Sequence, residues 1–134
     1  MRDLASNIAV RAVIAPVVVS DNTAAVGTVI DRLGFNSLAY VIATGTLADA
    51  DATFAVLLEE SDASGSGFAA VADADLIGTE ADAGFNYADD GEVRKLGYIG
   101  HKRYTRLTIT PTGNSGSAPI SAVALLSHAS TIPL

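Results

Sequence analysis

The sequence predicts an all-β protein, an antiparallel β-sandwich of about seven or eight strands with little helix. Valine, isoleucine and threonine recur in short runs, and clusters of Gly, Asn, Asp, Ser and Pro separate these runs. The turn sequences favour hairpins over crossover helices. Alanine is frequent within the runs, which indicates thin layers between two sheets. We therefore expect a sandwich of jelly-roll or immunoglobulin-like type.

The runs define the strands in chain order. We predict strands over residues 9–19, 26–31, 37–45, 52–60, 92–99, 103–110 and 120–127, with a short additional one over 68–71. Phe54, Val56 and Leu58 share one side of their strand, which marks its inward face. In the 37–45 run both alternating sets of side chains are largely apolar. This indicates a strand covered on both sides, by a second sheet or by a partner subunit.

The segment at residues 100–102 predicts a tight turn. It is too short for anything but a hairpin between the strands that flank it. Such a hairpin would place Tyr98 opposite Tyr104 and Leu96 opposite Arg106, all on one face.

The middle of the chain is expected to be less regular. Residues 63–67 predict a second hairpin. Helix is expected only within residues 68–78, as one or two turns. Residues 78–91 should form the least structured region, an acidic loop held in place by Phe85 and Tyr87.

The length and composition set the outline of the molecule. The chain has 134 residues and no cysteine, so we expect one sandwich domain over residues 1–134, with residues 1–8 as a candidate extended N-terminal arm. Hydrophobic residues make up 49% of the chain and charged residues 17%, a composition typical of folded proteins. Arg2 and the apolar run after it imitate a secretion signal, but Pro16 interrupts the run, so no signal is expected. No apolar stretch approaches the length of a membrane-spanning helix.

The charge distribution argues against nucleic acid and membranes as partners. The formal net charge is -7, which repels phosphate groups. From Leu33 to Val93 every charged residue is acidic, and after Arg106 no Asp, Glu, Lys or Arg follows. Five of the eight basic residues crowd into one stretch between these segments, namely Arg94, Lys95, Lys102, Arg103 and Arg106. The plain interpretation of this pattern is a set of solvated loops and one charged strand face.

The basic stretch also predicts a protein interface. Tyrosine and arginine offer large contact areas and directed hydrogen bonds, and they are enriched at interface hot spots. The candidate interface residues are Arg94, Tyr98, Lys102, Arg103, Tyr104 and Arg106. The two tyrosines fit equally well as an aromatic pair within the fold.

The acidic residues near position 50 are a poor match to a calcium loop. Asp49, Asp51 and Glu60 have the spacing of the first, third and twelfth ligands of that loop. Phe54 stands where the loop needs glycine, and an apolar strand follows it. We therefore expect no metal site, and we expect Asp49 and Asp51 to be turn residues.

The sequence holds no recognisable catalytic motif. His101 and His128 lie at no motif spacing from a nucleophile or a metal ligand. Glu59 and Glu60 project to opposite faces of a strand and cannot act as a facing acid and base. We expect no catalytic residue and no cofactor, and we predict that the chain is not an enzyme.

Residues 97–106 carry the pattern Gly-Tyr-x-Gly-x-Lys-Arg-Tyr-x-Arg. This pattern resembles one found in small proteins of tailed bacteriophages and prophages. Segments that match the same type are SNIAVRAVIAPVVVSDNT at 6–23, FNSLAYVIATG at 35–45, FAVLLEESD at 54–62, FAAVADADLIG at 68–78 and SAVALLSHAS at 121–130. The chain thus resembles, over nearly its whole length, the tailed-bacteriophage head-decoration (capsid cement) protein family of small jelly-roll type.

The resemblance implies a structural virion protein. Members of this family bind the outer surface of a capsid and stabilise contacts between major capsid proteins. The expected partners are the major capsid protein and sister copies, as a dimer or a trimer. The expected location is the capsid exterior, after synthesis in the host cytoplasm. We expect residues 4–19 and 107–134 and the basic stretch to face the capsid or sister copies, and the acidic loops within 59–90 to face solvent.

Two alternatives remain open at this stage. One is another structural role in the virion, such as a head-tail or fibre-associated protein. The other is a carbohydrate-binding β-sandwich module, which would need an exposed platform of aromatic side chains.

Overall fold

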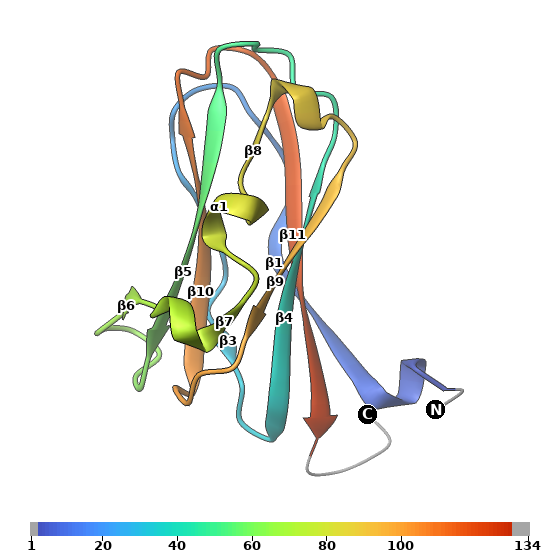
Figure 1. Cartoon of the computed structure of the whole chain (residues 1–134), viewed down its shortest axis with the longest axis vertical. Coiled ribbons are helices and arrows are strands. Elements are labelled where there is room, and N and C mark those ends of the chain that lie inside the picture. Colours follow the sequence, from blue (N-terminus) through green and yellow to red (C-terminus); the bar gives the residue numbers. More distant parts are fainter. Residues whose placement is uncertain (1–2, 130–134) are drawn as a thin grey trace.

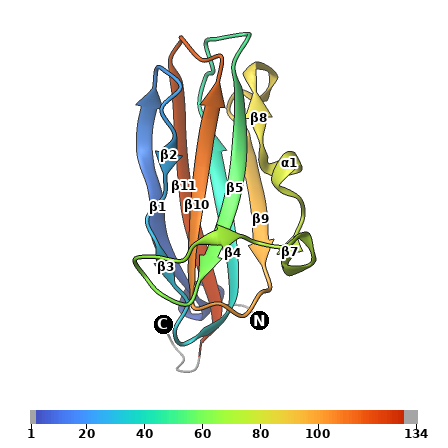
Figure 2. The same cartoon turned by 90° about the vertical axis from the view of Figure 1, so that its left-hand side faces the viewer.

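Two antiparallel sheets pack face to face in the computed structural model, which describes residues 3–129 (Figures 1 and 2). Sheet A consists, in spatial order, of β1 (Ile8–Val19), β11 (Ala118–Ala129), β4 (Phe35–Thr44), β9 (Val93–Tyr98) and β7 (Leu76–Ile77). Sheet B has the order β2 (Ala25–Val26), β10 (Tyr104–Thr112), β5 (Thr53–Ser61) and β6 (Ala69–Ala70), with β3 (Ile30–Asp31) also on β10 and β8 (Phe85–Asn86) also on β5. The short helical segments are η1 (Ala5–Asn7), η2 (Asp73–Asp75), α1 (Glu80–Ala83) and η3 (Tyr87–Asp89).

The strand order is that of a jelly roll. Along the chain the main strands alternate between the sheets, from β1 in sheet A to β2 and β3 in sheet B, then β4, β5, β9, β10 and β11 in turn. The pairs β2 with β3 and β6 with β8 each act as one interrupted strand along an edge of sheet B. The predicted all-β sandwich is therefore confirmed, and of the two types considered the jelly roll is the observed one.

The strand predictions are largely confirmed. Apart from the 26–31 run, the long strands begin and end within about two residues of the predicted limits. The predicted hairpin at 63–67 joins β5 to β6, where Glu59 pairs with Ala70. Along β5 the buried apolar side chains are Phe54, Val56 and Leu58, as alternation predicts, and Ser61 is buried at the end of the strand.

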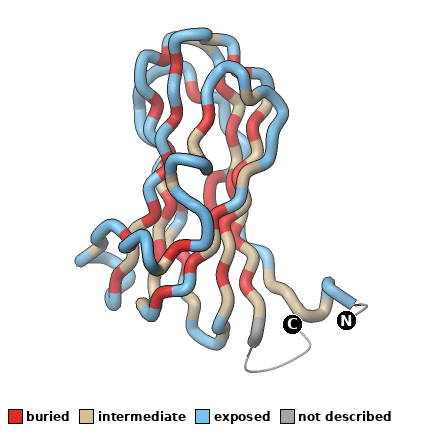
Figure 3. The backbone as a smooth tube through the Cα atoms, in the orientation of Figure 1, coloured by how far each residue is buried: buried red, intermediate tan, exposed pale blue. Residues whose placement is uncertain are grey.

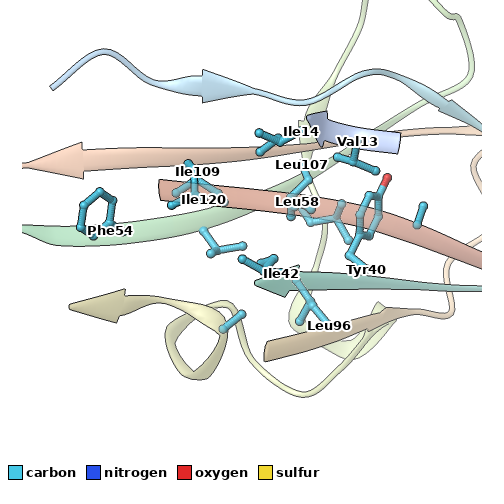
Figure 4. Packing of buried hydrophobic residues seen from close by; sticks show 14 of the residues in the cluster. Val13, Ile14, Tyr40, Ile42, Phe54, Leu58, Leu96, Leu107, Ile109 and Ile120 are labelled. Carbon is cyan, nitrogen blue, oxygen red and sulfur yellow. The ribbon is translucent and has the colours of Figure 1, made fainter. Parts of the chain in front are cut away.

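A continuous apolar layer separates the sheets. Buried and exposed positions alternate along the long strands, so that buried segments line up between the sheets (Figure 3). Tyr40 and Leu96 from sheet A meet Leu58 and Leu107 from sheet B in this layer, and all four are almost wholly buried (Figure 4). At the upper end of the layer Phe85 stacks on Phe54 with ring centroids 4.8 Å apart.

The predicted strand at 26–31 is broken in the middle. Gly27 donates a backbone hydrogen bond to the carbonyl of Leu107 at 2.7 Å, and Thr28 donates one to the carbonyl of Val13 at 2.9 Å. The chain here bonds first to sheet B and then to sheet A, which closes one side of the sandwich. A Cβ atom at Gly27 would lie only 2.6 Å from the Leu107 oxygen and from Val13 Cγ1, so this close approach requires glycine.

The predicted hairpin at 100–102 is wrong. β9 belongs to sheet A and β10 to sheet B, so the short connection crosses the sandwich instead of reversing within one sheet. Leu96 accordingly lies beside Tyr40, not Arg106, and Tyr98 pairs with Leu38, not Tyr104. A few residues suffice for the crossing because packed sheets lie only about 10 Å apart.

Arg32 holds this crossing in place. Its guanidinium donates to the carbonyl of Lys102 at 2.7 Å and to that of Gly100 at 3.2 Å. It also stacks over the ring of Tyr98, 4.9 Å from the centroid. Three contacts from the Arg32 side chain thus fix the conformation of the connection between β9 and β10.

Residues 78–91 are more regular than predicted, since they contain α1, β8 and η3. Thr79 caps α1 by accepting from the backbone N–H of Asp82 at 3.0 Å, and Asn86 caps η3 by accepting from that of Ala88. Within 68–78 the expected helical turns reduce to η2. Phe85 is buried, as expected of a residue that pins this segment, whereas Tyr87 is exposed.

α1 also protects the edge of β5. β6 and β8 pair with the two ends of that edge and leave its middle open. Glu80 of α1 fills the gap, because its carboxylate accepts the backbone N–H of Leu58 at 2.6 Å. The edge is thereby closed to pairing with another chain.

One buried polar pair joins the sheets inside the apolar layer. The Tyr40 hydroxyl of sheet A hydrogen-bonds the Thr105 hydroxyl of sheet B. Tyr40 and Thr105 are fully buried, and burial raises the pKa of Tyr40. The pair satisfies both hydroxyls where water has little access.

We predict that Thr105→Val destabilises the fold by about 1–3 kcal/mol, because it leaves the buried Tyr40 hydroxyl without this partner. Tyr40→Phe should cost a similar amount. The double variant should cost clearly less than the sum of the two, since it removes both hydroxyls together. Urea unfolding of the four proteins measures this, and strictly additive losses would contradict a coupled pair.

Candidate functional site

The six predicted interface residues do not form one patch. Arg94 and Tyr98 lie on β9 in sheet A, whereas Tyr104 and Arg106 lie on β10 in sheet B. The connection between the strands carries the other two. The linear cluster of the sequence is thus divided between the two layers of the sandwich.

Tyr98 is an internal support of the fold. Only 2% of its surface is exposed. Its hydroxyl donates to Glu60 Oε1 at 2.7 Å and accepts the backbone N–H of Lys102 at 3.0 Å. Burial, reinforced by the bond to Glu60, raises the pKa of Tyr98 to about 12. The prediction that Tyr98 offers its ring to a partner is therefore wrong, because its ring faces the core.

The basic side chains are engaged within the molecule. The ion pairs are Arg94 with Asp89 at 2.7 Å and with Glu92 at 2.9 Å, Lys102 with Asp62 at 2.7 Å, Arg103 with Asp31 at 2.8 Å, and Arg106 with Glu59 at 2.9 Å. Arg103 also stacks over Tyr104, with 4.9 Å from its guanidinium carbon to the ring centroid. Hydrogen bonding to Arg103 holds the pKa of Asp31 below its ordinary value, and the bond to Asp62 raises the pKa of Lys102. These pairs tie loops to strands and leave little basic charge free for a partner.

A second surface has the features of an interface more clearly. The strands of sheet A carry no acidic residue, although the molecule has a net charge of -7. The outward positions of this sheet are Ile8, Val10, Ala12, Ser37, Ala39, Val41, Ala43, Ile77, Val93, Lys95, Gly97, Ser121, Val123, Leu125 and Ser127. We call this surface the acid-free face. Val10, Ile77 and Val93 on it are each more than half exposed, and Lys95 is its one charged residue among those positions.

The acid-free face departs from the usual pattern of an antiparallel sheet. Such a sheet normally alternates apolar residues on its inner side with polar residues on its outer side. Here Val41 lies between Val123 of β11 and Lys95 of β9, with Ala39 and Ala43 on either side along β4. The predicted double-sided apolar strand at 37–45 is confirmed on its inner side, where sheet B covers it. Among residues 3–129, no other element covers its outer side.

The edge of sheet A next to this face is irregular. β1 is the edge strand, and its register with β11 shifts between Ala12 and Ile14 and again between Ile14 and Val17. The segment of residues 15–18, which we call the β1 rim, contains Pro16 and the exposed Val17 and Val18. Proline and a bulge both interrupt regular pairing along an edge.

Two shallow hollows flank the β1 rim, the first lined mainly by apolar groups and the second by polar and apolar groups in similar measure. One, of about 340 Å³, is lined by Pro16, Val17 and Val18 together with Ala43 and Pro119. The other, of about 490 Å³, lies along the chain from residue 13 to residue 26. Both could receive apolar side chains of another protein.

Apart from Asp3, Asp21, Asp31, Asp49 and Asp51, the acidic residues gather on the opposite edge of the sandwich. They lie at the end of β5 and in the segment that carries η2, α1 and η3, and they are Glu59, Glu60, Asp62, Asp73, Asp75, Glu80, Asp82, Asp89, Asp90 and Glu92. β1 lies at one side of the molecule, and β7, α1 and β8 lie at the other (Figure 2). The molecule is therefore polarised between this acidic edge and the acid-free face of sheet A, and Asp21 lies beside the β1 rim. The predicted role of residues 130–134 at an interface concerns positions outside the described residues.

The structure also locates the residues examined for metal binding and catalysis. Asp49 is a turn residue, as predicted: its carboxylate accepts the backbone N–H groups of Asp51 and Ser115 at 2.9 and 2.8 Å. Phe54 is a core residue, and His101 lies exposed in the crossing connection. Within residues 3–129 no group of three or more His, Cys, Asp or Glu side chains is placed to hold a metal ion. No helix in that range is long and apolar enough to cross a membrane.

Comparison with known proteins relates the chain to others by fold. No family model and no curated protein matches it. The solved structure of the PBSX exported protein XepA matches 100% of this chain with a TM-score of 0.58 and 17% identity. The chain spans 41% of XepA. At this identity the likeness supports a shared β-sandwich fold.

Two matches with lower scores come from carbohydrate-active proteins. A family 22 carbohydrate-binding module of Clostridium thermocellum Xyn10B has a TM-score of 0.45 and 12% identity, over 92% of this chain and 84% of the module. A family two carbohydrate esterase from Cellvibrio japonicus has a TM-score of 0.43 and 11% identity, over 96% of this chain and 32% of the esterase.

Tyr98→Phe should destabilise the protein by about 1–3 kcal/mol, because Glu60 and the Lys102 N–H lose a buried partner. Tyr104→Phe is the matched control. It should change stability by about 0.5 kcal/mol or less, since Tyr104 is only half-buried. Denaturant unfolding of both variants checks this, and equal losses would speak against a supporting role for Tyr98.

The ion pair of Asp31 with Arg103 should contribute stability that depends on pH. The folded-state pKa of Asp31 is lowered from 3.8, so its contribution is fully present above that pH and is lost as the pH falls through the folded-state value. Asp31→Asn should therefore lower the melting temperature at pH 7, and the difference from the natural protein should shrink between about pH 5 and pH 2. Arg103→Gln should give the same profile. A difference that stays constant with pH would contradict this assignment.

Proposed function

We propose that this chain is a structural virion protein that binds the outer surface of a phage capsid and holds neighbouring major capsid proteins together. The observation that carries the proposal is the polarity of the sandwich. An acidic edge lies opposite a β1 rim and an acid-free face that expose valine and isoleucine on a molecule of net charge -7. Apolar surface of this extent is typical of protein contacts.

The construction of the fold suits a clamp. The ion pairs, the Arg32 contacts and the Tyr98 hydrogen bonds hold connections that would otherwise be mobile. A rigid domain loses little conformational entropy on binding, so each contact retains more of its gross free energy. On a symmetric shell many copies bind at once, which multiplies a modest individual affinity.

The β1 rim is the surface we assign to the capsid. Val17 and Val18 are exposed and line both a mainly apolar hollow and a hollow of mixed lining, and β1 has one edge without a neighbouring strand in sheet A. A segment of the major capsid protein with apolar side chains would fill the hollows and approach this edge. The acidic edge would then face outward, where it would discourage contact with nucleic acid.

Two likenesses add support of a general kind. The sequence resembles phage head-decoration proteins over most of its length, and the fold matches a phage exported protein over the whole chain. Both fit a phage protein located on the exterior of the virion. Neither bears on the capsid site that the protein would occupy.

The carbohydrate-binding alternative receives less support from the arrangement of aromatic residues. Such a site generally needs an exposed aromatic platform. Of the four tyrosines and four phenylalanines, which all lie in the described region, Tyr87 is the exposed one. Phe68 packs under Arg106, with 4.3 Å from the guanidinium carbon to the ring centroid. A single exposed ring is a small platform for a sugar chain.

Co-sedimentation with undecorated capsids of the phage or prophage that encodes the chain tests the proposal. The natural protein should pellet with the capsids, and Val18→Asp should weaken binding about tenfold or more, because it puts a charge into an apolar contact. Leu33→Asp is the matched control, since Leu33 is equally exposed but lies in the turn after β3. It should bind like the natural protein. If the natural protein remains in the supernatant, the proposed function is wrong.

A further inference from the structure

We infer that the acid-free face binds the same face of a second copy, so that the protein is a two-fold symmetric dimer. This inference concerns sheet A alone, and it does not depend on the capsid as a partner. The resemblance led us to expect sister copies as partners, and this inference names the surface through which two copies would associate.

The composition of the face suits sheet-on-sheet packing. Small and large side chains alternate along β4, where Val41 lies between Ala39 and Ala43, and Val41 pairs with Val123 of β11. Two sheets pack at about 10 Å when small and large side chains interdigitate in this way. The inner face of sheet A already packs against sheet B by the same rule. The outer face offers a second apolar layer of similar character.

The area of sheet A matches what a dimer requires. With strands about 4.8 Å apart and about 3.4 Å per residue, the strands of sheet A cover roughly 700 Å². A specific interface of standard size buries about 800 Å² on each partner. This footprint includes the β1 rim, so the acid-free face alone is smaller, and sheet A as a whole is of the size that one contact with a second copy needs.

The charges of the molecule permit this contact. Two chains of charge -7 repel each other, and a close contact forms most easily where the acidic groups are farthest away. Stacking the acid-free faces places both acidic edges at the outside of the dimer. Contact through sheet B would instead bring Glu59 and Asp31 of two copies toward each other.

Lys95 determines the orientation of the two copies. It lies on β9 directly beside Val41 of the central strand β4. A two-fold axis parallel to the strands and passing over β4 would set β9 of one copy over β11 of the other. The two lysines would then lie at least two strand spacings apart, or about 10 Å, and each could extend its ammonium to solvent. Val41 would meet Val41 of the second copy at the axis.

Sedimentation equilibrium of the purified protein, with no capsid present, is the first test. The natural protein should have the mass of two 13.6 kDa chains at micromolar concentration. Val41→Glu should weaken the association about a hundredfold or more, because it buries a charge at the axis. Leu57→Glu, a matched change at an exposed position of sheet B, should leave the dimer intact. A natural protein that is monomeric, or an assembly of another size, would overturn the inference.

Cross-linking provides a second test that does not rely on the glutamate variant folding. The chain has no cysteine, so Val41→Cys and Leu57→Cys each introduce a unique thiol. A short bis-maleimide should join two Val41→Cys chains in high yield and should join Leu57→Cys chains poorly. Equal yields would overturn the inference. A dimer that fails to bind capsids would refute the proposed function and leave this inference standing.

Discussion

The apolar layer between the two sheets determines where every other feature of the molecule lies. Because side chains alternate along a strand, burying Tyr40 and Leu58 forces their neighbours Val41 and Leu57 outward. Core packing therefore does not determine which residues occupy these outward positions. Sheet A places small apolar residues there, whereas sheet B places threonines and a paired glutamate there. Core packing alone therefore does not explain the difference between the two outer faces.

The charged residues have a second role at the margins of this layer. Surface ion pairs usually contribute little to stability, about 0–1 kcal/mol each. Here they join elements distant in sequence, as when Arg103 holds Asp31 and Arg106 holds Glu59. Their main effect is to fix the edges of the sandwich, because each pair joins a strand or loop to its neighbour. Most of the acidic residues lie on one side of the molecule.

The sequence was sufficient to predict where the strands lie, but not which strands pair with one another. The alternation of Phe54, Val56 and Leu58 is a local property, so it predicted a buried face correctly. The pairing of β9 depends on which sheet receives the chain after Tyr98, and a short turn leaves that choice open. Thr79 and Asp82 have the spacing of a helix cap and are a local sign of α1, but the acidic composition of the segment around them is equally typical of a loop.

The candidate interface illustrates the same limit. A cluster of Tyr and Arg in the sequence pointed to a surface, but the crossing connection divides it between two layers. The acid-free face could not be found in this way, since its residues come from five strands that only the register brings together. The one local sign was the run at 37–45, apolar on both sides, and it pointed to the correct strand.

The close approach at Gly27 has a consequence for the history of the protein. Any side chain there would push apart the two strands that the chain bridges, so substitutions should be eliminated by selection wherever this bridge exists. Surface residues on either side can change freely, and overall identity between relatives can fall very low. A glycine at the position of Gly27 should therefore be conserved even where overall sequence identity is very low. Its presence would indicate common descent among jelly-roll proteins that share little other sequence.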